Sequence, residues 1–211
     1  MSERGRFITF EGIEGGGKSS HIEQVRRQLA AAGHHVRITR EPGGTAIGEG
    51  VRELLLQGPD MGSDTELLLV FAARAQHVEE VVRPAIEAGE WVLCDRFTDA
   101  SYAYQGSGRG IPWSRIAELE GWALGGLKPD VTLLFDLPVA QGLERAGRRS
   151  TPDRFEREEL DFFERVRRGY LARAEAEPAR FRIIDAGRSL EVVDRATHAR
   201  IEQILESAHD A

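Results

Sequence analysis

Eight consecutive residues near the N-terminus have the types and spacing of a phosphate-binding loop. They fit the pattern G-x-x-x-x-G-K-[ST] and are Gly12, Ile13, Glu14, Gly15, Gly16, Gly17, Lys18 and Ser19. In such a loop, glycines allow a tight turn whose backbone N–H groups face phosphate oxygens, the lysine reaches the β- and γ-phosphates, and the serine hydroxyl binds Mg²⁺. We therefore expect these residues and Ser20 to bind ATP, with Ser19 as a metal ligand.

A carboxylate follows a second apolar run. The run Trp91-Val92-Leu93-Cys94 ends in Asp95. An aspartate at the C-terminal end of a buried parallel strand lies in the crevice where such folds bind their ligands, so we expect Asp95 to help hold Mg²⁺ or its waters. Because an apolar run followed by aspartate is a common pattern, this prediction depends on the phosphate loop.

Apolar runs and segments of helical periodicity alternate along the chain, and they would position these groups. The apolar runs predict strands over 7–11, 35–39, 91–94, 131–135 and 181–184. The periodic segments predict helices over 18–32, 46–56, 65–88, 113–124, 138–146, 156–177 and 190–208. We therefore expect an α/β P-loop fold of three layers, with a five-stranded parallel sheet flanked by helices.

Length and composition favour a single domain over 1–211. The 211 residues, 41% of them apolar, can form one substantial core, and no linker or repeat divides them. No apolar run approaches the roughly 20 residues that span a bilayer, and the apolar stretch from Phe7 leaves no room for a signal peptide. The single cysteine, Cys94, suits a reducing compartment. We expect a cytoplasmic protein without a membrane partner.

The charge is acidic overall and basic in one segment. A formal net charge of −7 argues against nucleic acid as a partner, because affinity for a phosphate backbone comes from a basic surface. The segment 145–157 contains five arginines, Arg145, Arg148, Arg149, Arg154 and Arg157. Taken alone, such a run is typical of a solvated surface loop.

Five short motifs are more specific to one protein family than the lysine and serine of the phosphate loop. They are Phe10-Glu11-Gly12-Ile13-Glu14-Gly15, Thr39-Arg40-Glu41-Pro42-Gly43-Gly44-Thr45, Phe71-Ala72-Ala73-Arg74, Asp95-Arg96-Phe97 and Ala103-Tyr104-Gln105-Gly106. In order and spacing they resemble the bacterial thymidylate kinases, and the resemblance covers nearly the whole chain. It implies that a homodimer phosphorylates dTMP to dTDP with Mg-ATP, in dTTP synthesis.

The resemblance also implies which residues hold the phosphate and sugar of the acceptor. Arg52 and Arg96 match residues that grip the acceptor phosphate, and two guanidinium groups suit a dianion. Tyr104 matches an aromatic residue under the sugar that disfavours a ribose 2′-hydroxyl, and Glu14 corresponds to an acidic residue near that sugar. The peptide bond before Pro42 is expected to be cis and to shape the acceptor site.

Further matches concern the base. Arg74 matches a residue that hydrogen-bonds the thymine carbonyl, while Ser101 and Gln105 match positions beside the base. Many relatives carry a stacking aromatic four residues before this arginine, where this chain has Val70. Phe71, one residue later, is expected to substitute for it, with ordinary core packing as the alternative.

The resemblance implies that the arginine-rich segment 145–157 is a lid. Phosphoryl transfer needs positive charge around the transferred group, and the phosphate loop contains no arginine. The lid would supply that charge and exclude water. We predict Arg149 and Arg154 as its catalytic residues, with Arg145 and Arg148 as alternatives.

Lys18, Arg96 and Glu14 complete the predicted catalytic set. A general base is not required, because a monophosphate is already anionic near neutral pH, with a second pKa of about 6. Positioning and charge neutralisation would then account for most of the catalysis.

Two other functions stay open at this point. A deoxynucleoside kinase would use Glu11 or Glu14 as a base for a sugar hydroxyl, although two phosphate-gripping arginines suit a monophosphate better. A nucleotide-hydrolysing switch would share the phosphate loop, but the sequence lacks an N-K-x-D guanine-reading motif. The preferences for dTMP over dUMP and for ATP over GTP are also open.

Overall fold

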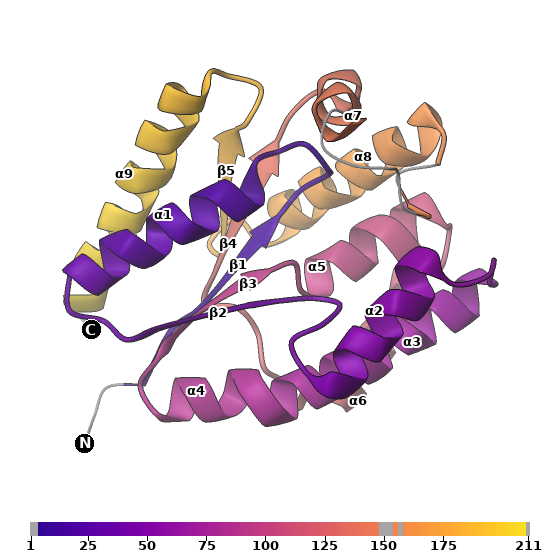
Figure 1. Cartoon of the computed structure of the whole chain (residues 1–211), viewed down its shortest axis with the longest axis horizontal. Helices are drawn as coiled ribbons and strands as arrows, with labels where there is room; N and C mark the ends of the chain where they lie inside the picture. The colour runs from indigo at the N-terminus through magenta and orange to yellow at the C-terminus, as the bar shows by residue number, and fades with distance from the viewer. Residues whose placement is uncertain (1–3, 148–153, 156–157, 210–211) are drawn as a thin grey trace.

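The structure is a computed structural model that describes residues 4–147, 154–155 and 158–209. Its central layer is a parallel sheet of β1 (Phe7–Glu11), β2 (Val36–Arg40), β3 (Trp91–Asp95), β4 (Val131–Asp136) and β5 (Phe181–Asp185). The strands lie in the order β2-β3-β1-β4-β5, so that β1 is central (Figure 1). The prediction of a five-stranded parallel sheet is confirmed.

The central strand brings the phosphate loop and the second carboxylate together. β1 is buried along its whole length and pairs with β3 on one side and β4 on the other. A strand covered on both faces needs consecutive apolar residues, as in the run that begins at Phe7. In the register of the sheet, Phe10 lies opposite Asp95, so the chain leaves β1 and β3 at the same edge.

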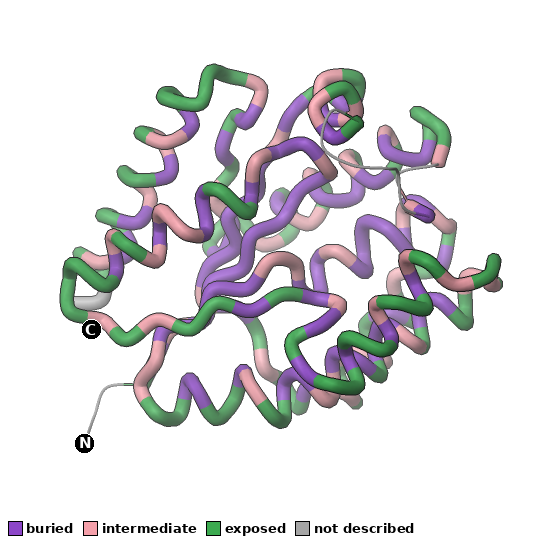
Figure 2. The backbone as a smooth tube through the Cα atoms, viewed as in Figure 1, coloured by how far each residue is buried: buried purple, intermediate pink, exposed green. Residues whose placement is uncertain are grey.

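Helices cover both faces of the sheet and complete three layers (Figures 1 and 2). On one face, α1 (Lys18–Ala31) packs against α9 (Leu190–His209). The other face is covered by α4 (Arg83–Glu87), α5 (Thr98–Ser101), η2 (Tyr102–Gly108) and α8 (Leu160–Ala176). In Figure 2 the inner strands β1, β3 and β4 and the inward sides of these helices are mostly buried, whereas the edge strands β2 and β5 contain exposed residues. This arrangement confirms the predicted three-layer α/β fold.

Further helices lie at the periphery. They are α2 (Ala46–Gln57), α3 (Ser63–His77), η1 (Val78–Val82), α6 (Trp113–Leu124) and α7 (Val139–Gly147). The segments α3, η1 and α4 follow one another without a break, close to the single helix predicted over 65–88. Pro84 has no backbone N–H to donate, and the π-helical turns of η1 come directly before it.

One helical segment was missed from the sequence. No helix was predicted between the strand over 91–94 and the helix over 113–124, yet α5 and η2 together continue through Gly108. A Cβ atom at Gly106 would lie 2.6 Å from Nε1 of Trp113, and one at Gly108 would lie 2.7 Å from the ring of Phe162. These glycines therefore permit close helix packing. No helix in the described part of the chain is both long and apolar enough to cross a bilayer.

Candidate functional site

The predicted phosphate loop connects β1 to α1, and three of its glycines have conformations that favour glycine. Gly12, Gly15 and Gly17 have φ angles of 129°, 75° and 82°. A Cβ atom at Gly12 would lie 2.4 Å from the carbonyl oxygen of Phe135, and one at Gly15 would lie 2.1 Å from that of Gly142. The loop therefore packs against the end of β4 and against α7 in a way that only glycine allows.

Lys18 folds back over this loop. Its Nζ atom donates hydrogen bonds of 2.9 Å to the carbonyl oxygens of Gly12 and Ile13. Burial and the neighbouring charge of Arg96 lower the pKa of Lys18 to about 8. The ammonium group thus lies at the head of α1, among backbone groups that can face phosphate oxygens.

Ser19 and Asp95 meet beside the loop. The Ser19 hydroxyl donates to Oδ2 of Asp95 across 3.4 Å. The other carboxylate oxygen, Oδ1, is buried and has no hydrogen-bond partner among the described residues. Because a buried carboxylate oxygen is costly unless it is paired, this pair fits a hard cation or its waters.

Arg96 has an unusual backbone conformation that directs its side chain to the loop. It is the one described residue other than glycine with a positive φ, at 69°. Its NH1 donates to the carbonyl oxygen of Gly12 at 2.9 Å, and its NH2 donates to Oε1 of Glu14 at 2.7 Å. The guanidinium carbon lies 5.0 Å from the ring centre of Tyr104. Arg96 therefore joins the loop to the predicted sugar site.

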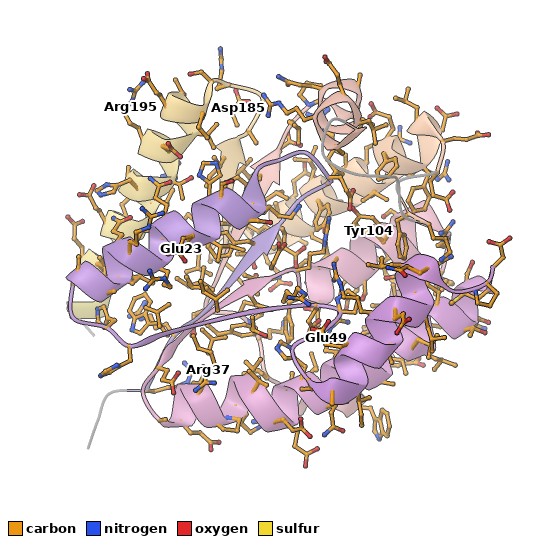
Figure 3. All side chains as sticks on the ribbon, in the orientation of Figure 1. Glu23, Arg37, Glu49, Tyr104, Asp185 and Arg195 are labelled. Atoms are coloured by element: carbon orange, nitrogen blue, oxygen red, sulfur yellow. The ribbon has the colours of Figure 1, made fainter. Side chains whose placement is uncertain are left out.

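Glu14 is held between two predicted acceptor residues. Besides its contact with Arg96, it accepts a 2.7 Å hydrogen bond from the Tyr104 hydroxyl at Oε2. Burial raises the pKa of Glu14, but the charges of Arg96 and Lys18 and the Tyr104 hydrogen bond outweigh burial and hold the pKa below its usual value. Glu14 is thus an ionised group that lines the cavity. Its hydrogen-bond partner Tyr104 is labelled in Figure 3.

Glu11 lies behind Arg96, away from the cavity lining. Its Oε1 accepts a 2.7 Å hydrogen bond from the backbone N–H of Phe97, and its Oε2 accepts one of 2.8 Å from the Tyr170 hydroxyl. The same hydroxyl accepts a 3.0 Å hydrogen bond from NH1 of Arg96. Burial and the charge of Asp99 raise the pKa of Glu11 to about 8. Glu11 supports both the backbone and the side chain of Arg96, a role that its motif did not predict.

A single cavity extends from the phosphate loop to the predicted base site. The predicted residues that line it are Glu14, Gly15, Gly16, Gly17, Lys18, Ser19, Pro42, Arg52, Arg74, Asp95, Arg96, Ser101, Tyr104 and Gln105. The lining residues that sequence reasoning missed are Glu41, Leu55, Leu56, Val70, Ala100, Ala146 and Phe155. Gly12 and Ile13 contribute through their carbonyl oxygens to Lys18, and Ser20 is exposed on α1.

At the far end of the cavity, Arg74 is held by a buried carboxylate. Its Nε donates to Oε2 of Glu41 at 2.6 Å, and its NH1 donates to the Ser101 hydroxyl at 2.9 Å. Glu41 also contacts Nδ1 of His77, at 2.8 Å. A guanidinium group has five N–H donors, and the carbonyl oxygen of Phe97 takes a third. Two N–H groups of Arg74 therefore have no acceptor among the residues that the structure describes and are available to a ligand.

The turn after β2 has the predicted conformation. The Glu41–Pro42 peptide bond is cis, which confirms that prediction. The carbonyl oxygen of Pro42 accepts a 2.9 Å hydrogen bond from NH1 of Arg52 on α2. Arg52 is thereby directed from α2 towards the middle of the cavity, near the phosphate end.

The prediction that Phe71 contacts the base needs a correction, since Phe71 does not line the cavity. Its ring belongs to a buried cluster with Leu67 and Tyr102 and lies 4.7 Å below the guanidinium of Arg74. On α3, Val70 and Arg74 are four residues apart and share the cavity face, while Phe71 is rotated away from it. Core packing, the alternative interpretation, is what the structure shows.

The arginine-rich segment is described only in part. Arg148, Arg149 and Arg157 lie outside the described residues. Arg154 is buried, and its NH2 lies 2.6 Å from Oε2 of Glu66 on α3, outside the cavity lining. Arg145 donates to the carbonyl oxygen of Ala186 at 2.8 Å. Neither contact directs an arginine to the phosphate loop, so the catalytic roles stay predictions.

The parallel sheet, the glycine loop at the head of α1 and the carboxylate at the end of β3 define a P-loop protein. The cavity that connects this loop to the predicted acceptor residues is that of a nucleotide kinase. A family model described as thymidylate kinase matches residues 10–197. The chain is 57% identical over 204 residues to a thymidylate kinase of Pseudomonas syringae pv. syringae, covering 96% of this chain and 97% of the relative.

Other relatives agree. The chain is 55% identical over 201 residues to a thymidylate kinase of Methylococcus capsulatus, covering 95% of this chain and 97% of the relative. A crystal structure of thymidylate kinase from Ehrlichia chaffeensis superimposes with a TM-score of 0.76 at 31% identity, over 96% of this chain and 99% of that one. The chain belongs to the thymidylate kinase family. The prediction of this family, and of an enzyme that carries out ATP-dependent phosphotransfer, is confirmed.

Proposed function

We propose that the chain, acting as one kinase domain, transfers the γ-phosphoryl group of Mg-ATP to dTMP to form dTDP. The observation that carries this proposal is the single cavity, which joins the phosphate loop to a pocket containing Arg74 and Gln105. Membership of the thymidylate kinase family supports the same reaction. In the cell, the product would feed dTTP synthesis.

The donor phosphates would bind at the loop. Lys18 would exchange the carbonyl oxygens of Gly12 and Ile13 for β- and γ-phosphate oxygens. Ser19 and Asp95 would hold Mg²⁺, which would neutralise charge on the phosphates. The fit of this pair to Mg²⁺ is supported by the buried Oδ1 of Asp95, which has no hydrogen-bond partner in the described part of the chain.

The acceptor would lie across the middle of the cavity. Arg52 and Arg96 would bind its phosphate, and the ring of Tyr104 would lie under its sugar. Glu14 would keep Arg96 and Tyr104 in place through its two carboxylate oxygens. Since the acceptor phosphate is already anionic, this arrangement needs no general base.

Additional positive charge would come from Arg149 or Arg154. For Arg154, this role requires that its ion pair with Glu66 be broken. The contacts of Arg154 support a different role equally well, since they anchor it to α2 and α3. Replacing each arginine singly with methionine, and measuring kcat, would separate a catalytic role from an anchoring one.

We also propose a cytoplasmic homodimer. Trp122 on α6 is 83% exposed and Leu68 on α3 is 58% exposed, and these two helices pack together. Large apolar side chains exposed on adjacent helices favour a protein interface. Sedimentation of the wild type and of a Trp122→Arg variant would test the homodimer, which predicts a dimer that the substitution converts to monomer.

The decisive experiment is an ADP-release assay with ATP and Mg²⁺, run without acceptor and with dTMP, dUMP, dCMP, AMP or thymidine. We expect release to depend on dTMP. Release with thymidine instead would support a deoxynucleoside kinase, and equal release without acceptor would support a nucleotide-hydrolysing switch. Repeating the assay with GTP would give the donor preference.

A further inference from the structure

Glu66 is a completely buried carboxylate behind the base end of the cavity, and it has no role in the reaction proposed above. It lies on α3, two helical turns before Arg74, and its side chain is 1% exposed. Its Oε1 accepts a 2.8 Å hydrogen bond from Nε2 of Gln105. Its Oε2 lies 2.6 Å from NH2 of Arg154 and 3.3 Å from NH2 of Arg109.

The carboxylate determines which end of the Gln105 amide enters the cavity. An ionised carboxylate only accepts hydrogen bonds, so only the NH₂ end of the amide can face Glu66. The amide is planar, and Gln105 lines the cavity, so its carbonyl oxygen is the end available to a ligand. Gln105 therefore offers an acceptor, whereas Arg74 offers only donors.

This donor and acceptor pair matches one type of pyrimidine. Thymine and uracil present a carbonyl oxygen at position 4 beside an N–H at position 3. Cytosine presents the reverse, an amino group at position 4 beside an unprotonated ring nitrogen. With Arg74 and Gln105 in these orientations, a cytosine would place its amino group against the donors of Arg74 and its ring nitrogen against the acceptor of Gln105. Buried polar groups without a hydrogen-bond partner are costly.

We infer that Glu66 is a positioning residue that makes the site specific for 4-keto pyrimidine monophosphates and rejects 4-amino pyrimidines such as dCMP. The inference rests on the proposed function, and it adds the residue that sets the polarity of the base site. Glu66 acts through Gln105 and touches no substrate itself.

The surroundings of Glu66 keep it in this orientation. Arg154 also donates from Nε to the carbonyl oxygen of Leu55 at 2.8 Å, so it bridges α2 and α3. The next residue, Phe155, lines the cavity, and its ring lies 4.7 Å from the guanidinium carbon of Arg154 and 5.8 Å from that of Arg109. Both arginines need an oxygen from residue 66, because they are donors only.

Because Arg154 and Arg109 are donors only, they determine the orientation of the amide in the Glu66→Gln variant. In that variant the amide oxygen would stay with Arg154, and the amide NH₂ would replace Oε1 and face Gln105. Gln105 would then have to turn its own oxygen towards residue 66 and its NH₂ into the cavity. Gln105 would then present a hydrogen-bond donor to the base in place of an acceptor, without a change in the volume of the site.

The experiment measures kcat/KM for dTMP and for dCMP in the same ADP-release assay. We expect Glu66→Gln to lower the dTMP-to-dCMP ratio by about tenfold or more, with KM for ATP unchanged. Arg109→Gln is the matched control, since it removes a charge beside Glu66 and leaves the carboxylate facing Gln105. It should keep the wild-type ratio.

A double variant, Glu66→Gln with Gln105→Glu, exchanges the amide and the carboxylate. It would again present an acceptor to the base, so we expect its ratio to return towards the wild-type value. A ratio unchanged in Glu66→Gln, or a folded double variant without preference for dTMP, would overturn the inference. If Glu66→Gln does not fold, the double variant decides alone. Failure of the proposed function would appear separately, as wild-type enzyme without dTMP-dependent ADP release.

Discussion

The two ends of the cavity are built in different ways. The phosphate end consists of one contiguous loop and of Asp95 and Arg96, which lie at the C-terminal end of β3. The base end consists of single side chains from α3, η2 and the turn after β2, which two buried carboxylates, Glu41 and Glu66, hold in place. An anion can be bound by backbone N–H groups, whereas a base needs donors and acceptors at defined angles. In this protein, buried carboxylates and their partners fix the angles of those donors and acceptors.

The largest expected effect concerns the ion pair that holds the base end. Replacing Arg74 with leucine would remove the guanidinium group that pairs with the buried carboxylate of Glu41. Breaking such a pair lowers the free energy of unfolding by about 3–5 kcal/mol, which urea denaturation would measure. The exposed pair of Arg37 with Glu90 provides the control, and Arg37→Leu should cost less than about 1 kcal/mol. Equal effects of the two substitutions would contradict this account of the base end.

At the phosphate end, loss of the Lys18 side chain should lower turnover and leave the stability of the fold intact. Lys18→Ala would remove the cation that reaches the transferred phosphate, and we expect kcat to fall by about 10²–10³-fold. The chain has one other lysine, Lys128, which lies on the surface. Lys128→Ala should keep wild-type kcat in the ADP-release assay. An active Lys18→Ala enzyme would remove the loop from the mechanism.

Between the two ends, Arg96 depends on a second layer of residues. Tyr170→Phe would remove the hydroxyl that links Arg96 to Glu11, and we expect KM for dTMP to rise by about 5–10-fold with KM for ATP unchanged. Tyr102→Phe is the matched control, because that hydroxyl donates to Glu120 on α6. An equal rise of both KM values in Tyr170→Phe would indicate a general loss of structure instead.

A further prediction is a pH dependence at the phosphate end. Burial lowers the pKa of Lys18 to about 8, so the ammonium group loses its proton as the pH rises through that value. Because kcat/KM for ATP reports the free enzyme, it should be about tenfold lower one pH unit above this pKa. Burial raises the pKa of Glu11 to about 8 as well, so Glu11→Gln is the control. The decrease in kcat/KM at high pH should persist in the Glu11→Gln variant. If the decrease disappears, the titrating group is Glu11.

Much of the phosphate end could be predicted from sequence because local residue types determine it. Glycines at 12, 15 and 17 permit the positive φ angles of the loop, and those angles need no distant partner. The cis bond before Pro42 was predicted from the resemblance to the thymidylate kinases. The base end was predicted less well, since Phe71 faces the core, and neither Glu66 nor Phe155 belongs to any motif used in the prediction.

Residue types at short spacing specify the alternation of strands and helices, the phosphate loop and the family, so all three could be predicted before the structure was known. The strand order, the direct hydrogen bond of Ser19 to Asp95 and the contact between Glu66 and Gln105 became known from the tertiary structure. The last two pairs are 76 and 39 residues apart in the chain. Contacts over such separations depend on how the helices pack on the sheet, and no local pattern specifies them.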